Sequence, residues 1–293
     1  MAESPAHRFG QIIGKLLESI VHPQLNEFCS EQGLYLDHQL RIRPARRGRK
    51  VSWTDQYGNL HDLDFVIERD GTDQQIGRPL AFIESAWRRY PKHSRNKAQE
   101  IQGAILPLAD KYRWNNPFLG TVLAGVFTRG SLDQLRSLGF QVLYFPYDMI
   151  VKAFQLEGID IAFDEHTPDS VFGQTAEQIE ASPPDVMIRV RQHLIDANQV
   201  AVDEFFGTLR QRLSRYVTRV VITPLYGRVN EFTTIEDTVS FLEQHRIYEG
   251  QANFEDMIYA LTSRMPTKLR LPSKPKTRWR SFWPLSRGSK MTN

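Results

Sequence analysis

Two neighbouring stretches of the chain decide the fold: HDLDFVIE at residues 61–68 and PLAFIESAW at residues 79–87. Branched and aromatic side chains dominate both stretches, which is typical of buried strands. Each stretch also carries carboxylates within its apolar run. An ionised carboxylate is costly to bury without a partner. We therefore expect two strands whose acids share a compensating cation, and the natural candidate is a hard metal ion such as Mg²⁺.

The segments around these strands predict an α/β core. Apolar residues at helical spacing predict a helix over 9–32, and Gly33 is suited to end it. Strands are predicted at 50–55, 59–69, 79–87, 120–127 and 140–145, and the two stretches above lie within 59–69 and 79–87. Further helices are predicted at 94–112 and 131–138. This order predicts a central mixed β-sheet flanked by helices.

The rest of the chain has a different pattern. Residues 167–185 are rich in proline, glycine and serine, as in a linker, and leave room for a short helix inside. Helices are predicted over 185–216 and 235–244, and a strand over 219–225. We expect a core at 1–165, a mostly helical α+β accessory or recognition region at 166–265, and a disordered tail at 266–293.

The charge is unevenly distributed. The net charge is +3, yet nine cations and no acid follow Asp256. The tail therefore is strongly basic, and it interleaves cations with aromatic rings in RWRSFW at 278–283. Such a segment suits nucleic acid, an anionic membrane surface or a partner protein.

A second basic cluster precedes the acidic strands. Its members are Arg41, Arg43, Arg46, Arg47, Arg49 and Lys50. Clusters of this kind commonly contact phosphate backbones. The alternative is a solvated charged surface.

Composition excludes several classes of protein. The single cysteine, Cys29, rules out an internal disulfide framework and a thiolate zinc site. No apolar run approaches the roughly 20 residues of a membrane span. The first residues lack the long apolar segment of a secretory signal. We expect a cytoplasmic protein.

The acids of the two strands form the candidate site. Alternation places Asp62, Asp64 and Glu68 on one face of their strand. On the neighbouring strand Glu84 shares a face with Phe82 and Ala86. One carboxylate from each strand could form a metal-binding pair, and Asp62 and Glu68 are expected to face solvent. A metal held by this pair could activate water for the hydrolysis of a phosphodiester.

This arrangement resembles the PD-(D/E)XK nuclease superfamily, whose restriction-endonuclease-like core is a helix, three strands, a helix and a strand. The resemblance covers about 9–145. It implies that Asp64 is the first acid, Glu84 the second, and Glu18 an additional metal-binding acid from the first helix. It also implies Mg²⁺ or Mn²⁺ as cofactor, DNA as substrate, and a restriction or defence role, as a homodimer or in a larger complex.

The chain departs from the family pattern at one position. The lysine expected two residues after Glu84 is Ala86. Some members of the family carry this cation on the following helix, where Lys97 could serve. Arg88 and Lys92 are the rivals, and both could also contact nucleic acid. Some members place a helix glutamine near the metal, and the matching positions are Gln99 and Gln102.

Three functions stay open on the sequence. The first is a metal-dependent DNA endonuclease that uses Asp64, Glu84 and Lys97. The second is a catalytically inactive subunit on the same fold that binds nucleic acid or serves assembly, which Ala86 favours. The third is a protein-interaction module whose basic tail docks on a membrane or a partner.

Overall fold

The computed structural model describes residues 4–46, 48–90, 94–214, 217–223, 228–244 and 258–263. The chain divides into two compact units, Met1–Leu213 and Ser214–Asn293. Three of the predictions concern residues outside the described ranges: those for Arg47, for Lys92 and for the basic tail at 266–293.

A five-stranded mixed sheet forms the centre of the first unit. Its strands lie in the order β1 (Tyr35–His38), β4 (Phe65–Arg69), β5 (Arg78–Arg88), β6 (Phe118–Gly125) and β7 (Gln141–Pro146). β4 is antiparallel to both of its neighbours, whereas β5, β6 and β7 run parallel to one another. This confirms the expected α/β class with a central mixed sheet flanked by helices.

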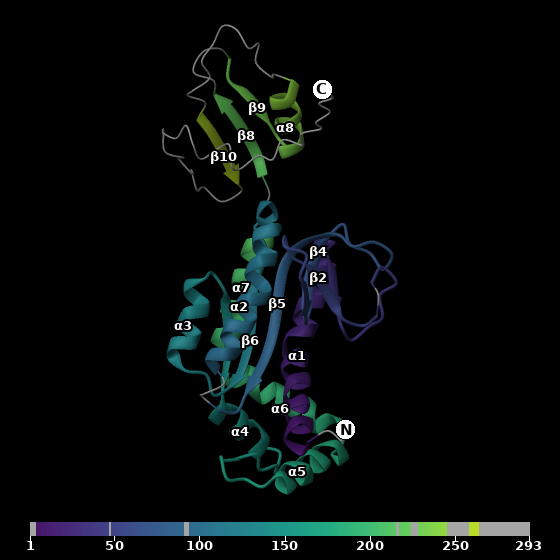
Figure 1. The fold of residues 1–293 in the computed structure, drawn as a ribbon, viewed down its shortest axis with the longest axis vertical. Coiled ribbons are helices and arrows are strands. Elements are labelled where there is room, and N and C mark those ends of the chain that lie inside the picture. Colours follow the sequence, from purple (N-terminus) through teal and green to yellow (C-terminus); the bar gives the residue numbers. More distant parts are fainter. Residues whose placement is uncertain are drawn as a thin grey trace, which may run out of the picture. The chain divides into compact units, whose positions relative to one another are not determined.

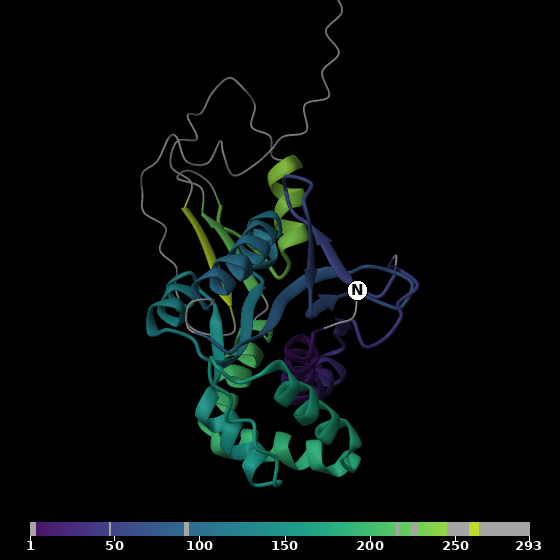
Figure 2. The ribbon, with the colours of Figure 1, turned by 60° about the horizontal axis from the view of Figure 1, so that its bottom comes forward.

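One face of the sheet is covered by a large group of helices. These are α1 (Pro5–Gln32), α4 (Tyr147–Gln155), α5 (Asp169–Ala181), α6 (Pro184–Ala197) and α7 (Gln199–Leu213). The side chain of Ser4 caps the start of α1, and Gly33 ends it at a φ of 63°, the left-handed conformation that favours glycine. Figure 1 shows α1 running alongside β5, and Figure 2 shows α5 and α6 gathered beside α1.

The other face is covered by α2 (Ser94–Lys111), α3 (Arg129–Ser137) and a two-stranded ribbon of β2 (Val51–Thr54) and β3 (Leu60–Leu63). Ala98, Ile101, Ile105 and Leu108 form the buried stripe of α2. Alternate residues of β5 serve the two faces: Ala81 and Ile83 face the α1 side, and Phe82 and Ala86 face the α2 side. The interior is therefore two apolar layers separated by the sheet.

The strand predicted at 59–69 is in fact two strands. It breaks at Asp64, so that β3 pairs with β2 while β4 joins the central sheet. The short edge strand β1 was not predicted, because Asp37 and His38 give it a polar composition. The break at Asp64 matters for function, since it places this acid at a junction between two sheets.

The first unit extends further along the chain than expected. The segment predicted as a linker at 167–185 contains α5, whose Phe172, Ala176 and Ile179 are buried. The helix predicted at 185–216 is two helices, α6 and α7, interrupted at Asn198. Because α5, α6 and α7 contribute to the same apolar cluster as α1, the division at 213/214 differs from the predicted boundary at 165/166.

The second unit contains a small antiparallel sheet. Its strands lie in the order β10 (Ile258–Ser263), β8 (Val217–Thr223) and β9 (Asn230–Phe232). Helix α8 (Ile235–Gln244) begins after Thr234, whose hydroxyl accepts a hydrogen bond from the Asp237 amide. Among the helices that the structure describes, none has the length and apolar character that crossing a membrane requires.

Candidate functional site

Three elements bring the candidate residues together. β4 and β5 are paired so that Phe65 lies opposite Ile83. Asp64 and Glu84 are therefore neighbours on adjacent strands, next to the last residue pair of this ladder. Glu84 lies in the middle of β5 and faces the α2 side, like Phe82 and Ala86. Lys97 lies in the first turn of α2. The fold therefore supplies the two acids from strands and the cation from the covering helix.

Asp64 is held in place by the residue that follows Glu84. Its Oδ2 atom accepts two hydrogen bonds of 2.6 Å, one from the backbone amide of Ser85 and one from the Ser85 hydroxyl. Burial raises the pKa of Asp64, while the two Ser85 donors and the charge of Lys97 act in the opposite direction. Ser85 thus orients the carboxyl group of Asp64 through Oδ2 and makes no hydrogen bond to Oδ1.

Glu84 is the most perturbed acid of the site. Burial, and next the negative charge of Asp64, raise the pKa of Glu84 to about 8, against the lowering influence of Lys97. Its Oε2 atom is buried and has no hydrogen-bond partner among the described residues. A buried carboxylate oxygen without a partner is costly. Glu84 is therefore suited to accept either a proton or a cation.

Lys97 lies against Glu84. Its Nζ atom is 3.6 Å from Glu84 Oε1 and 3.5 Å from Glu100 Oε2. The side chains of Lys97 and Glu84 are 18% and 17% exposed, so water screens this pair only in part. Ala86, where the family pattern has lysine, is buried in the apolar cluster that includes Ala98 of α2. Because Ala86 on β5 is covered by α2, the cation that contacts Glu84 is Lys97 of α2 and not a residue of the strand.

Glu18 approaches the pair from the other side, on α1. Burial, and next the charge of Asp64, raise the pKa of Glu18 to about 7, while Gln39 and Lys15 lower it. The Gln39 amide donates a hydrogen bond of 3.0 Å to Glu18 Oε1. Within the described parts of the chain, no three His, Cys, Asp or Glu side chains converge as a metal-binding group. Glu18 is thus electrostatically coupled to Asp64 without completing a three-acid cluster.

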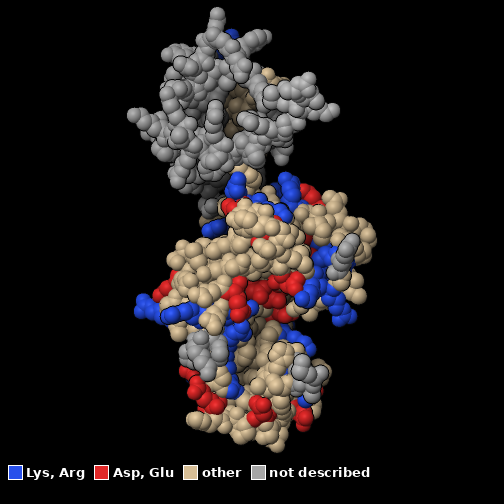
Figure 3. Space-filling view, in the orientation of Figure 1, with Lys and Arg blue, Asp and Glu red and all other residues tan. Residues whose placement is uncertain are grey.

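The charges of the site suit a hard divalent cation. Mg²⁺ is commonly bound through one or two carboxylates, with water completing its shell. Asp64 and Glu84 supply two carboxylates, and the orphaned Glu84 oxygen gives such an ion a natural ligand. Figure 3 shows acidic side chains gathered over the middle of the first unit, with basic side chains beside them. The residues present therefore fit a metal ion held by Asp64 and Glu84.

Part of the basic cluster before the strands has a structural role. Arg43 is buried and forms ion pairs of 2.6 Å with Glu68 and 2.9 Å with Asp37. Arg46 pairs with Asp37 at 2.8 Å, and its side chain is 5% exposed. Neither guanidinium is presented to a phosphate, contrary to the expectation for this cluster. Glu68 was expected to face solvent and is instead fully buried, because Arg43 compensates its charge.

The remaining members of the cluster lie on the surface. Arg41 pairs with Asp73, and Lys50 pairs with Asp62. Arg49 is exposed. These three cations are the part of the cluster that stays accessible to a nucleic acid.

The rival cation and the helix glutamines are placed away from the acids. Arg88 donates to the carbonyl of Trp87 and lies 3.6 Å from Glu100. Gln99 is exposed, and Gln102 accepts a hydrogen bond from Gln134 of α3. Of the predicted cations that the structure describes, Lys97 is the one that contacts Glu84.

Several residues of the site were not predicted from the sequence. Ser85 orients Asp64, and Gln39 contacts Glu18. Thr121 lies opposite Glu84 on β6, with a buried hydroxyl that has no partner among the described residues. The position of Ser85 directly after Glu84 is a signal that could have been used. Gln39 and Thr121 gave none, because their proximity depends on the tertiary fold.

Comparisons with known proteins give no family for this chain. No protein-family pattern matches the sequence, and no curated protein matches it. A solved structure, described as the crystal structure of protein of unknown function AF1548, aligns with 66% of this chain and 98% of its own at 10% identity and a TM-score of 0.28. A similarity this weak carries no argument about fold or function.

Proposed function

We propose that this protein is a metal-dependent DNA endonuclease with a restriction-endonuclease-like core of the PD-(D/E)XK type. The observation that carries the proposal is the contact between Lys97 and Glu84, in a site where Asp64 is the neighbouring acid. Together with Asp64, this contact would supply the three charged groups of the family pattern, with Lys97 in place of the lysine that is missing at Ala86. The order of elements in the first unit supports the same assignment.

Two carboxylates would hold the metal ion. Asp64 would contribute the oxygen that Ser85 leaves available, and Glu84 its unpartnered oxygen. A bound Mg²⁺ would lower the pKa of a coordinated water and offset negative charge on the phosphate. Ser85 would hold Asp64 in its orientation through two hydrogen bonds. Lys97 would hold a positive charge beside Glu84.

The reaction is the hydrolysis of a phosphodiester. A water oxygen forms a bond to phosphorus and gives up a proton to solvent, one ester bond from phosphorus to oxygen breaks, and the leaving oxygen takes up a proton from solvent. Negative charge grows on the phosphate oxygens as this proceeds. The ammonium group of Lys97 is placed to stabilise that charge in a partly buried site, where electrostatic interactions are stronger than in water.

The acidity of the site also explains the need for a metal. Glu18, Asp64 and Glu84 interact electrostatically, with Lys97 and Lys15 as the cations that act on them. A nucleic-acid phosphate is repelled by this excess of negative charge. We expect a divalent cation to be required for DNA to reach the site as well as for its cleavage.

A second candidate is a DNA-binding subunit without activity. It is favoured by the burial of Ala86 and by the lack, among the described residues, of three His, Cys, Asp or Glu side chains grouped to hold a metal ion. Such a subunit would hold DNA through surface cations, with a steep dependence on salt and no requirement for metal.

The test is the cleavage of supercoiled plasmid with Mg²⁺ or Mn²⁺ by the parent, by Asp64→Asn and by Glu84→Gln. Conversion of the plasmid by the parent alone supports the nuclease. DNA binding without cleavage in all three proteins, under either metal, would replace it with the inactive subunit. An exposed acid, Glu31→Gln, is the control for a change of one charge on the surface.

A further inference from the structure

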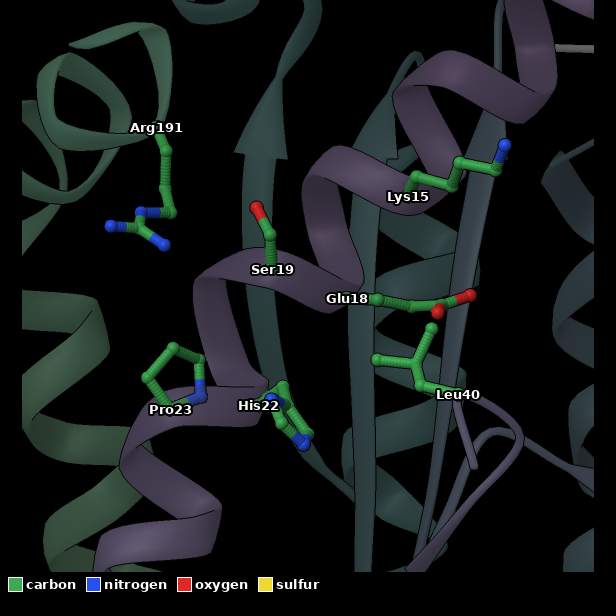
Figure 4. Close-up of a pocket in the computed structure, with 7 residues that line it drawn as sticks. All are labelled: Lys15, Glu18, Ser19, His22, Pro23, Leu40 and Arg191. Atoms are coloured by element: carbon green, nitrogen blue, oxygen red, sulfur yellow. The ribbon is translucent and has the colours of Figure 1, made fainter. Parts of the chain in front are cut away.

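A pocket of about 330 Å³ lies on the side of α1 that carries Glu18. Its lining residues, shown in Figure 4, are Lys15, Glu18, Ser19, His22, Pro23, Leu40 and Arg191. Five of them come from successive turns of α1, while Leu40 follows β1 and Arg191 belongs to α6. The pocket shares Glu18 with the candidate site, so a ligand in it would lie next to Glu18, which interacts electrostatically with Asp64.

Two cations of the pocket are available to an anion. Lys15 and Arg191 make no hydrogen bond or ion pair with the residues that the structure describes. They approach from two different helices, and Figure 4 shows Arg191 on the opposite side of the Ser19 side chain from Lys15. Lys15 acts electrostatically on Glu18 without forming an ion pair with it. A cation on each side of a cavity provides positive charge for the phosphates that flank a nucleotide.

Apart from Glu18 and Ser19, the rest of the lining is apolar or aromatic: Pro23, Leu40 and His22. Pro23 is exposed, and Leu40 is 59% exposed although it is a large hydrophobic side chain. Burial lowers the pKa of His22, which favours an uncharged ring at neutral pH. That ring lies edge-on to His38 at 4.5 Å between centroids and stacks on Phe65 at 6.2 Å, so neighbours fix its orientation.

Charge and apolar surface together identify the occupant. A nucleotide combines an anionic phosphate with a flat, largely apolar base, and bases pack on apolar and aromatic side chains in single-strand-binding proteins. A volume near 330 Å³ is at the lower end for ligand pockets and suits one nucleotide better than a base pair. A base that is paired and stacked in a duplex cannot enter such a pocket.

The segment that carries Leu40 strengthens this assignment. Leu40 and Ile42 are 59% and 69% exposed and flank Arg41. Proteins that separate base steps use exposed apolar side chains of this kind as wedges. Gln39, next to Leu40, is bonded to Glu18. The segment is thereby tied to the candidate site.

We propose that this pocket binds one unpaired nucleotide of the strand that is cut, with its base against Leu40, Pro23 and His22 and the phosphates on its two sides at Lys15 and Arg191, one at each cation. This inference rests on the proposed nuclease and names its substrate class: DNA that is single-stranded or locally unpaired beside the scissile phosphate. Duplex DNA would then be cut where it opens.

The test is fluorescence anisotropy with a labelled 12-nucleotide single strand and with a fully paired duplex of the same sequence, with Ca²⁺ present. The variants are Leu40→Ala and the double variant Lys15→Ala/Arg191→Ala. Their controls are Leu156→Ala, an equally exposed leucine, and Lys152→Ala/Arg129→Ala, two exposed cations away from the pocket. Melting temperatures verify that each variant is folded.

We expect the parent to prefer the single strand, and both pocket variants to weaken its binding at least tenfold. The duplex should change less than twofold with Leu40→Ala, and the controls should match the parent. No preference for the single strand, or an unchanged Kd in Leu40→Ala, would overturn the inference. If the parent binds in this way but does not cleave plasmid, the proposed nuclease activity would be overturned. The assignment of the pocket to an unpaired nucleotide would be kept.

Discussion

The Nζ atom of Lys97 lies 3.6 Å from Oε1 of Glu84, although the two residues belong to different elements, α2 and β5. The pair is partly buried, and Glu84 is flanked by Asp64 on its other side. Without Lys97, two neighbouring carboxyl groups would share a poorly solvated site with no nearby compensating charge. The lysine thus stabilises the ionised form of Glu84 and fixes a positive charge where a phosphate would bind.

Lys97→Ala should reduce plasmid cleavage by about 10²- to 10³-fold, the usual cost of removing one group that stabilises charge in the transition state. Lys97→Arg should retain part of the activity, because it keeps the charge and changes the geometry. The measurement is the initial rate of nicking under saturating Mg²⁺. Lys152→Ala, an exposed lysine on α4, is the control. Equal rates in Lys97→Ala and the control would remove Lys97 from the site.

The raised pKa of Glu84 has a consequence for stability. At pH values between its ordinary pKa of 4.5 and about 8, the unfolded chain has lost this proton while the folded protein retains it. The unfolded state therefore binds fewer protons, and the free energy of unfolding falls as the pH rises through this range. Metal-free protein should be less stable at pH 8 than at pH 5 for this reason.

Glu84→Gln should remove that dependence, because an amide does not ionise. In the presence of a chelator, its melting temperature should exceed that of the parent by at least about 2 °C at pH 8 and be similar at pH 5. Glu100→Gln is the matched control, since Glu100 contacts the same lysine but is 59% exposed. A parent and a Glu84→Gln variant with parallel pH profiles would show that Glu84 is ionised in the folded protein.

Arg43 is expected to be essential for stability. Its guanidinium is fully buried between Glu68 and Asp37, so Arg43→Ala would leave two buried acids without this partner. Breaking a buried ion pair in this way costs about 3–5 kcal/mol. Arg41→Ala should cost at most about 1 kcal/mol, because its pair with Asp73 is on the surface. Urea unfolding of both variants measures the difference, and similar losses would contradict the structural role of Arg43.

The sequence predicted the strands and helices of the core well where the apolar pattern was strong. β5, α2, β6 and β7 lie within a few residues of their predicted ranges, since each has a clear run of buried side chains. The short edge strand β1 escaped prediction, because it is held by pairing with β4 and has little apolar character of its own. The helix α5 was anticipated only as a short helix within a segment whose composition also suits a linker.

The candidate site was predictable in its strand residues and less so elsewhere. Asp64 and Glu84 are conspicuous because they interrupt apolar strands. Nothing in the local sequence distinguishes Arg43 and Arg46 from the exposed cations of the same cluster. Their burial depends on ion pairs with Asp37 and Glu68 that form only in the folded protein. Arg191 carries no local signal at all, since it reaches the pocket through the packing of α6 near α1.

The most direct test of the account is a calorimetric titration of the protein with Mg²⁺ at pH 7, repeated in two buffers of different ionisation enthalpy. We expect the parent to bind Mg²⁺ with release of protons, because the cation displaces the proton that a pKa of about 8 leaves on Glu84. Asp64→Asn and Glu84→Gln should both lose this binding. Equal affinity for Mg²⁺ in all three proteins, or none in the parent, would contradict a metal site at Asp64 and Glu84.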